Sequence, residues 1–146
     1  MNNLPVEILL VEDNPDDAAL AIRSLKKQNL ANRLVHLQDG AEALDFIFGT
    51  GKYQGQPLDQ APKVIFLDIN MPKVNGLEVL QKLRAEPFSK TIPVVILTSS
   101  AEDPDVKKAY ELGANSYIVK PVEFENFSKT VAELGMYWMM INHFSK

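Results

Sequence analysis

Residues Val64 to Pro72 read VIFLDINMP, and the interpretation of the whole chain starts from this stretch. Four apolar residues run directly into one acid, Asp68. A continuous apolar run of this length is typical of a strand buried on both faces of a parallel sheet. A carboxylate at the end of such a strand is costly to bury unless it has partners or a chemical use. The role of Asp68 therefore depends on which segments the fold brings next to it.

Four more apolar runs of strand length alternate with segments of helical pattern. The predicted strands are Val6–Val11, Arg33–Leu37, Val64–Asp68, Pro93–Leu97 and Ser116–Val119. The predicted helices run from Pro15 to about Asn29, from Gly40 to Phe48, from Gly76 to Ala85, from Pro104 to a stop at Gly113, and over roughly Glu123–Asn142. Strand and helix alternate five times, which predicts an α/β fold with a parallel sheet covered by helices on both faces.

Composition argues against several classes of protein. The chain has 146 residues, of which 46% are hydrophobic and 23% charged, with a net charge of −4 and no cysteine. This length predicts one domain, residues 1–146. The chain has no basic stripe of the kind that binds nucleic acid, and its apolar runs of at most five or six residues are too short to span a membrane. No signal peptide is evident, and the expected location is the cytoplasm.

Polar side chains follow the predicted strands at one edge of the sheet. Glu12 and Asp13 come after the first strand, and Asp68 ends the third. Thr98 follows the fourth strand and Lys120 the fifth. Ligands of open parallel sheets bind at the carboxyl ends of the strands, where these five side chains are expected to meet. Taken singly, each is more simply a helix cap or a strand terminus, so the functional signal lies in their joint spacing.

The combined set fits a site for phosphoryl transfer. Neighbouring carboxylates repel one another unless a cation joins them, and ligands that are all oxygen suit Mg²⁺. Lys120 would supply a compact positive charge, and the hydroxyl of Thr98 could donate to an oxyanion. Phosphoryl transfer requires mainly positioning and neutralisation of charge. Asp68 is therefore the predicted nucleophile, which would become an aspartyl phosphate.

Four segments together resemble the receiver domains of two-component response regulators. They are LLVEDN at 9–14, FLDINMPKVNG at 66–76, VVILTSS at 94–100 and SYIVKP at 116–121. The resemblance covers Val6 to about Leu134. It implies a flavodoxin-like, doubly wound fold with five parallel strands in the order 2-1-3-4-5.

The resemblance also implies the phosphoacceptor and the metal ligands. By this resemblance Asp68 accepts the phosphoryl group from the phosphohistidine of a sensor histidine kinase. Asp13 binds Mg²⁺ directly, and Glu12, where many members of the family have Asp, binds it through water. Asp68 and the backbone carbonyl of Asn70 complete the ligands. In a crystal Mn²⁺ or Ca²⁺ is expected to be able to take the place of Mg²⁺.

The remaining roles implied by the resemblance concern the response to phosphate. Thr98 bonds a phosphoryl oxygen, and Lys120 pairs first with Asp68 and then with the phosphate. Tyr117 takes the position of an aromatic switch, whose ring turns inward when Thr98 moves. The Lys120–Pro121 bond is expected to be cis, an isomer that proline tolerates.

Within this family the chain resembles the small single-domain regulators of bacterial phytochromes. The features are the VEDNP start, the GKYQGQP loop, the DINMPKVNG segment and the C-terminal YWMMIN. The resemblance implies phosphate from a phytochrome kinase, no output domain, an unknown downstream partner, and a homodimer through the face of the fourth helix, fifth strand and fifth helix. The alternative is a relay intermediate or phosphate sink that passes phosphate to a histidine phosphotransfer protein.

Two segments exceed what a plain receiver needs. The loop at 49–62 is long enough to be functional or disordered. In the last predicted helix some apolar side chains remain beyond those expected to face the sheet: Met136, Tyr137, Met139, Met140 and Phe144. They form either a partner or dimer surface, because methionine-rich surfaces adapt to partners, or extra packing against the fourth helix.

Other uses of the fold fit less well. An aspartyl-phosphate phosphatase would need a second Asp two residues after the nucleophile, and this place holds Asn70. A flavin carrier would need a phosphate-cradling loop after the first strand, but EDNPDD is acidic and would repel phosphate. His36 is expected to be a packed residue of its strand rather than a relay histidine. Phosphate lifetime is expected to depend partly on Asn70 and Ser100.

Overall fold

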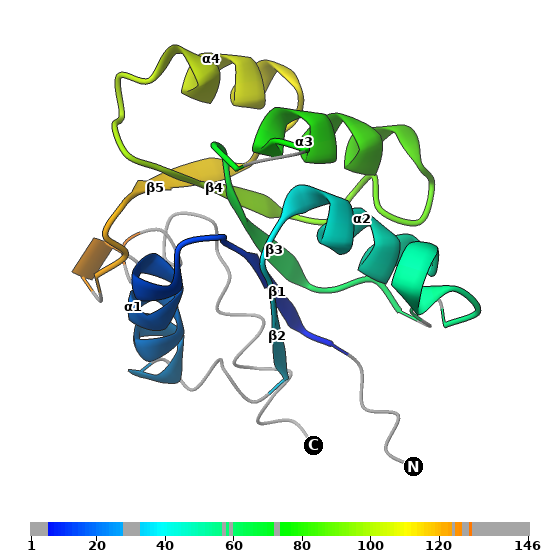
Figure 1. Cartoon of the computed structure of the whole chain (residues 1–146). Coiled ribbons are helices and arrows are strands. Elements are labelled where there is room, and N and C mark those ends of the chain that lie inside the picture. Colours follow the sequence, from blue (N-terminus) through cyan, green and yellow to red (C-terminus); the bar gives the residue numbers. More distant parts are fainter. Residues whose placement is uncertain are drawn as a thin grey trace.

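The computed structural model describes residues 6–27, 33–56, 58, 60–71, 74–123, 125, 126 and 129, and the statements below concern these residues. Five strands form one parallel sheet in the order β2-β1-β3-β4-β5. They are β1 Ile8–Val11, β2 Leu34–Leu37, β3 Val64–Asp68, β4 Val94–Thr98 and β5 Ser116–Val119. Fold class and strand order are those expected, and Figure 1 shows the strands side by side at the centre of the molecule.

Helices cover both faces of this sheet. They are α1 Pro15–Lys27, α2 Gly40–Phe48, α3 Gly76–Ala85 and α4 Pro104–Glu111. Alternate residues of each strand point to opposite faces. Leu10, Phe66 and Val95 pack in one core with α1, whereas Leu9, Leu67 and Ile96 belong to a second core with α2, α3 and α4. In Figure 1 α1 accordingly lies on the other side of the sheet from α2, α3 and α4.

Three strands begin one or two residues later than predicted. β1 begins at Ile8 instead of Val6, β2 at Leu34 instead of Arg33, and β4 at Val94 instead of Pro93. Pro93 has no N–H to give to the ladder, although its carbonyl still accepts the N–H of Ile65 at 2.9 Å. At its other end β4 includes Thr98, one residue beyond the predicted end.

Local capping fixes where the helices begin. Asp39 accepts the N–H of Glu42 at 2.7 Å and caps α2. Asn75 caps α3 through a capping box with Glu78. Asp103 caps α4 with Pro104 at its start, as the sequence predicts. These caps place each helix directly after a strand end, and that is where the polar residues collect.

The first part of the 49–62 loop is held against α2. It contains the short 3-10 helix η1, Gly51–Tyr53. The hydroxyl of Thr50 donates to Asp45 at 2.8 Å, and the ring of Tyr53 packs edge-on against Phe46 at 5.2 Å between centroids. Glu42 accepts from Lys52 at 2.9 Å and from the hydroxyl of Tyr53 at 3.2 Å. Residues 50–53 are thus held by side chains of α2, an arrangement that the length of the loop did not predict.

The predicted last helix falls mostly outside the described residues. Of the range 123–142 the structure describes Glu123, Glu125, Asn126 and Lys129. The apolar tail, and with it the expected dimer surface, therefore remains a prediction. Among the described helices, none is long and apolar enough to cross a membrane.

Candidate functional site

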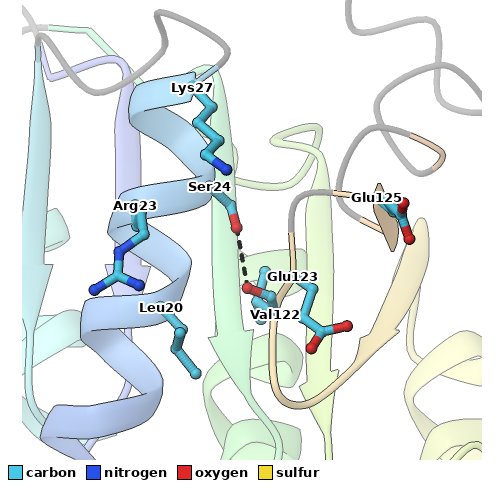
Figure 2. A pocket seen from close by; sticks show the side chains of 7 residues that line it. All are labelled: Leu20, Arg23, Ser24, Lys27, Val122, Glu123 and Glu125. Carbon is cyan, nitrogen blue, oxygen red and sulfur yellow. Dashed lines mark hydrogen bonds between the residues drawn. The ribbon is translucent and has the colours of Figure 1, made fainter.

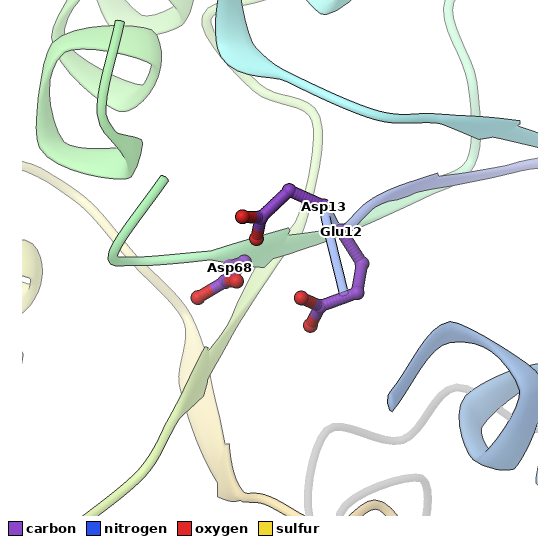
Figure 3. A group of neighbouring side chains, drawn as sticks. All are labelled: Glu12, Asp13 and Asp68. Atoms are coloured by element: carbon purple, nitrogen blue, oxygen red, sulfur yellow. The ribbon is translucent and has the colours of Figure 1, made fainter. Parts of the chain in front are cut away.

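Three carboxylates meet at the carboxyl edge of the sheet. Asp68 ends β3, and Glu12 and Asp13 follow β1 on the neighbouring strand. One ligand atom from each lies within 4.8 Å of the others. Glu12 is 0% and Asp68 1% exposed, whereas Asp13 is exposed to solvent. Figure 3 shows the three side chains pointing toward one another, so the sequence prediction that these acids meet is confirmed.

Lys120 places its ammonium among the acids. Its Nζ lies 3.2 Å from Asp68 Oδ2 and 3.4 Å from Glu12 Oε1. It also lies 3.3 Å from Asp17 Oδ2, in the first turn of α1. Nothing in the local sequence around Asp17 predicts a contact with the end of β5. Asp17 is therefore a residue of the site that the sequence reading missed.

Burial and mutual repulsion change the proton affinity of the acids. Burial raises the pKa of the Glu12 carboxyl to about 8, and its hydrogen bond and like charge with Asp68 act in the same direction. Burial also raises the pKa of Asp68, against the lowering effect of hydrogen bonds from Glu12 and from the N–H of Asn70. Without a cation, Glu12 and Asp68 therefore hold a proton between them near neutral pH.

Burial and the neighbouring acids have opposite effects on the pKa of Lys120. Burial acts to lower the pKa of Lys120, but the negative charges of Asp68 and Glu12 outweigh burial, and the pKa is raised. The ammonium is therefore charged at every pH at which the protein is expected to work. A fixed positive charge beside Asp68 suits the binding of a phosphoryl oxygen.

Thr98 is the last residue of β4, and Tyr117 lies within β5. The buried hydroxyl of Thr98 donates to the carbonyl of Ser100 at 3.1 Å. Tyr117 is half-buried, and its ring lies edge-on to Tyr110 of α4 with 6.2 Å between centroids. The hydroxyl of Thr98 must therefore turn from Ser100 to reach a group on Asp68.

Backbone contacts shape the site around Asp68. The N–H of Asn70 donates to Asp68 Oδ1 at 3.1 Å, and the side chain of Asn70 reaches Asp103 Oδ2 at 3.4 Å. A Cβ on Gly76 would collide with the backbone of Asp68 and Ile69. Glycine at this position thus lets the start of α3 lie directly against the end of β3. The Lys120–Pro121 peptide bond is cis, as expected.

The acidic group fits a divalent cation. Two of the three carboxylates are buried, and a buried carboxylate needs a positive partner. Lys120 supplies one positive charge beside Glu12 and Asp68. Together with Asp13, the group therefore still carries more negative than positive charge. Hard oxygen ligands of this kind suit Mg²⁺ or Mn²⁺.

His36 and a separate surface hollow lie outside the acidic group. His36 is half-buried, and its Nε2 bonds the backbone carbonyl of Glu12 at 2.8 Å, which agrees with the expected packed residue of β2. A hollow of about 320 Å³ lies between α1 and the segment after β5 (Figure 2). Ser24 in its wall donates to the carbonyl of Val122 at 3.0 Å. This hollow contains none of the predicted site residues.

Comparison with known proteins agrees with this arrangement. The family model described as "Response regulator receiver domain" matches residues 8–132. The probable methanogenesis regulatory protein FilR2 of Methanothrix harundinacea is 38% identical over 138 residues, which cover 92% of this chain and 84% of FilR2. The response regulator Rcp1 of Synechocystis is also 38% identical over 138 residues, covering 94% of this chain and 92% of Rcp1.

Solved structures extend the comparison. The bacteriophytochrome response regulator RtBRR is 47% identical, with a TM-score of 0.81 over 90% of this chain and 79% of that one. Rcp1 has been solved in a Mn²⁺-bound form, with a TM-score of 0.73, 38% identity, and 92% and 95% of the two chains covered. Family match, identity and fold agree: the chain belongs to the response regulator receiver domains and is related to the regulators of phytochromes.

Proposed function

We propose that this response regulator accepts a phosphoryl group on Asp68 from the phosphohistidine of a sensor histidine kinase. The observation that carries the proposal is the buried carboxylate of Asp68, with Lys120 Nζ 3.2 Å from its Oδ2 and two further acids within 4.8 Å. A buried acid at the end of a parallel strand, with an ammonium and a candidate divalent metal site beside it, is suited to covalent phosphorylation.

The proposed transfer is a displacement at phosphorus. A carboxylate oxygen of Asp68 forms a bond to phosphorus, and the bond between phosphorus and the kinase's imidazole nitrogen breaks. The imidazole keeps the electron pair of the broken bond. Phosphorylation requires Asp68 to be ionised, so the proton held with Glu12 must leave or move to Glu12.

Glu12, Asp13 and Asp68, with the backbone carbonyl of Asn70, would hold Mg²⁺. When bound, Mg²⁺ neutralises the phosphoryl oxygens and compensates the crowded acids. The ammonium of Lys120, 3.2 Å from Asp68 Oδ2, would bind a phosphoryl oxygen. The N–H of Asn70 keeps the carboxylate of Asp68 oriented through Oδ1.

The switch follows from the hydroxyl of Thr98. Phosphorylation adds about 1.5 to 2 negative charges at neutral pH, close to the buried end of β4. Thr98 then exchanges the carbonyl of Ser100 for a phosphoryl oxygen, and the space beside it opens to the ring of Tyr117. Because Tyr117 contacts Tyr110, this movement reaches the surface of α4.

The first experiment is phosphorylation by a small donor. Acetyl phosphate and Mg²⁺ are added to the wild-type chain, and intact mass is measured. We expect a gain of one phosphoryl group, no gain in Asp68→Asn, and an ordinary gain in Asp16→Asn, which removes an exposed acid of α1. An unmodified wild-type protein would contradict the proposal.

We further propose that the kinase is of the phytochrome type, supported by the likeness to RtBRR and Rcp1. Transfer from an autophosphorylated bacteriophytochrome kinase should be faster than from a histidine kinase of another input class. Equal rates from both kinases would contradict this pairing. Onward transfer from phosphorylated Asp68 to a histidine phosphotransfer protein would instead favour a relay intermediate.

A further inference from the structure

Asp17 is a charged residue beside the site that the proposed phosphoryl chemistry does not use. Its Oδ2 lies 3.3 Å from Lys120 Nζ, and its side chain is 26% exposed. The carboxylate is not needed to cap α1, because Asn14 already accepts the backbone N–H of Asp17 at 3.0 Å. The contact with Lys120 therefore needs an explanation other than the start of the helix.

Lys120 meets three carboxylates with the three N–H donors of its ammonium. The distances are 3.2 Å to Asp68, 3.3 Å to Asp17 and 3.4 Å to Glu12. Asp68 and Glu12 belong to the acidic group that can hold a metal ion, and Asp17 does not. Of these three partners, Asp17 is thus the one whose charge stays free for Lys120 when a metal ion binds the others.

We propose that Asp17 is a positioning residue that draws the ammonium of Lys120 toward α1 and so reduces its competition with Mg²⁺ for Glu12 and Asp68. An ammonium and a divalent cation that share the same carboxylates repel each other at short range. A carboxylate outside the metal group gives the ammonium an alternative partner. The inference rests on the Mg²⁺ site of the proposed function but not on phosphorylation itself.

The test measures Mg²⁺ binding to the unphosphorylated protein by calorimetry. We expect Asp17→Asn to weaken binding by about threefold to fivefold, the size expected for one partly exposed ion pair. The matched control is Asp16→Asn, which removes the same charge from the exposed neighbour. At physiological salt it should change binding by less than about twofold, because exposed charges are screened. Asp17→Glu keeps the charge and should restore most of the affinity.

The dependence on Lys120 separates positioning from a general charge effect. When Asp17→Asn is introduced into the Lys120→Met variant, Mg²⁺ affinity should change no more than it does when Asp16→Asn is introduced. If Lys120→Met does not fold, Lys120→Gln serves as the background in its place. The inference would be overturned if Asp17→Asn weakened Mg²⁺ binding only as much as the Asp16→Asn control. It would also be overturned if the weakening persisted in the variant that lacks Lys120. Wild-type protein that binds Mg²⁺ as expected but is not labelled by acetyl phosphate would reject the phosphoacceptor function alone. Wild-type protein without saturable Mg²⁺ binding would overturn both.

Discussion

The guanidinium of Arg84 donates two hydrogen bonds to the backbone carbonyl of Gly113, from Nε at 3.1 Å and from Nη2 at 2.8 Å. It also donates to Asn115 Oδ1 at 3.2 Å, and the same oxygen accepts the N–H of Val94 at 2.8 Å. Arg84 thus connects the end of α3 to the turn between α4 and β5. Burial lowers its pKa, but a guanidinium remains charged at any physiological pH.

Loss of this guanidinium should destabilise the fold. Arg84→Ala would leave the carbonyl of Gly113 without its donor, and we expect the free energy of unfolding in urea to fall by about 2 to 3 kcal/mol. The matched control is Lys82→Ala, whose exposed ion pair with Glu86 is worth less than about 1 kcal/mol. Equal losses in the two variants would show that the Arg84 contacts do not stabilise the protein.

The close approach of α3 to β3 should make Gly76 intolerant of a side chain. In Gly76→Ala the new Cβ meets backbone atoms of Asp68 and Ile69, which cannot move aside as a flexible side chain would. We expect a loss of about 1 to 3 kcal/mol in the free energy of unfolding.

The comparison for this variant is Gly55→Ala. A Cβ at Gly55 meets nothing within 4 Å, although the φ of +81° still disfavours alanine by about 1 kcal/mol. Gly76→Ala should therefore be the less stable of the two in thermal unfolding. It should also weaken Mg²⁺ binding, which Gly55→Ala leaves unchanged because Gly55 lies in the loop after η1.

The site shows which features a sequence can predict and which it cannot. The apolar strand before Asp68, and the acids and lysine at the other strand ends, were readable because parallel strands place their carboxyl ends at one edge. The contacts of Asp17 and Arg84 could not be predicted, because their partners are far away in sequence. Neither residue has a local sequence context that distinguishes it from an ordinary helix residue. The turn of Thr98 toward Ser100 depends on a rotamer, which spacing does not determine.

The order of the loop before β3 should depend on Glu42. The hydrogen bond from Lys52 is the main cause that holds the pKa of Glu42 below its usual range. Glu42→Gln should accelerate amide hydrogen exchange over residues 50–56, whereas Glu111→Gln, at an exposed position of α4, should not. Because the folded pKa is depressed, this stabilisation is present above the unfolded pKa and lost as pH falls through the folded one. Exchange protection that is unchanged in Glu42→Gln would rule out this anchor.

The buried acids predict an unusual pH dependence in the absence of metal. The pKa of Glu12 is raised to about 8 in the folded chain from 4.5 in the unfolded one, mainly by burial, so the folded state binds the proton more tightly. In EDTA, the contribution of Glu12 to the free energy of unfolding should therefore be most favourable below about pH 4.5. It should decline as pH rises toward 8. A rise from 4.5 to about 8 corresponds to a decline of roughly 5 kcal/mol.

Glu12→Gln tests this origin, because glutamine keeps the shape of the side chain and carries no proton that titrates in this range. Urea unfolding of the variant in EDTA should be nearly independent of pH between 5 and 8, apart from the smaller contribution of Asp68, whose pKa burial also raises. Mg²⁺ should stabilise the wild type more at pH 8 than at pH 5.5, since protons and the cation compete for the same carboxylates. A wild-type curve that stays flat in EDTA would show that Glu12 is ionised in the folded protein throughout this range, and that Lys120 alone compensates its charge.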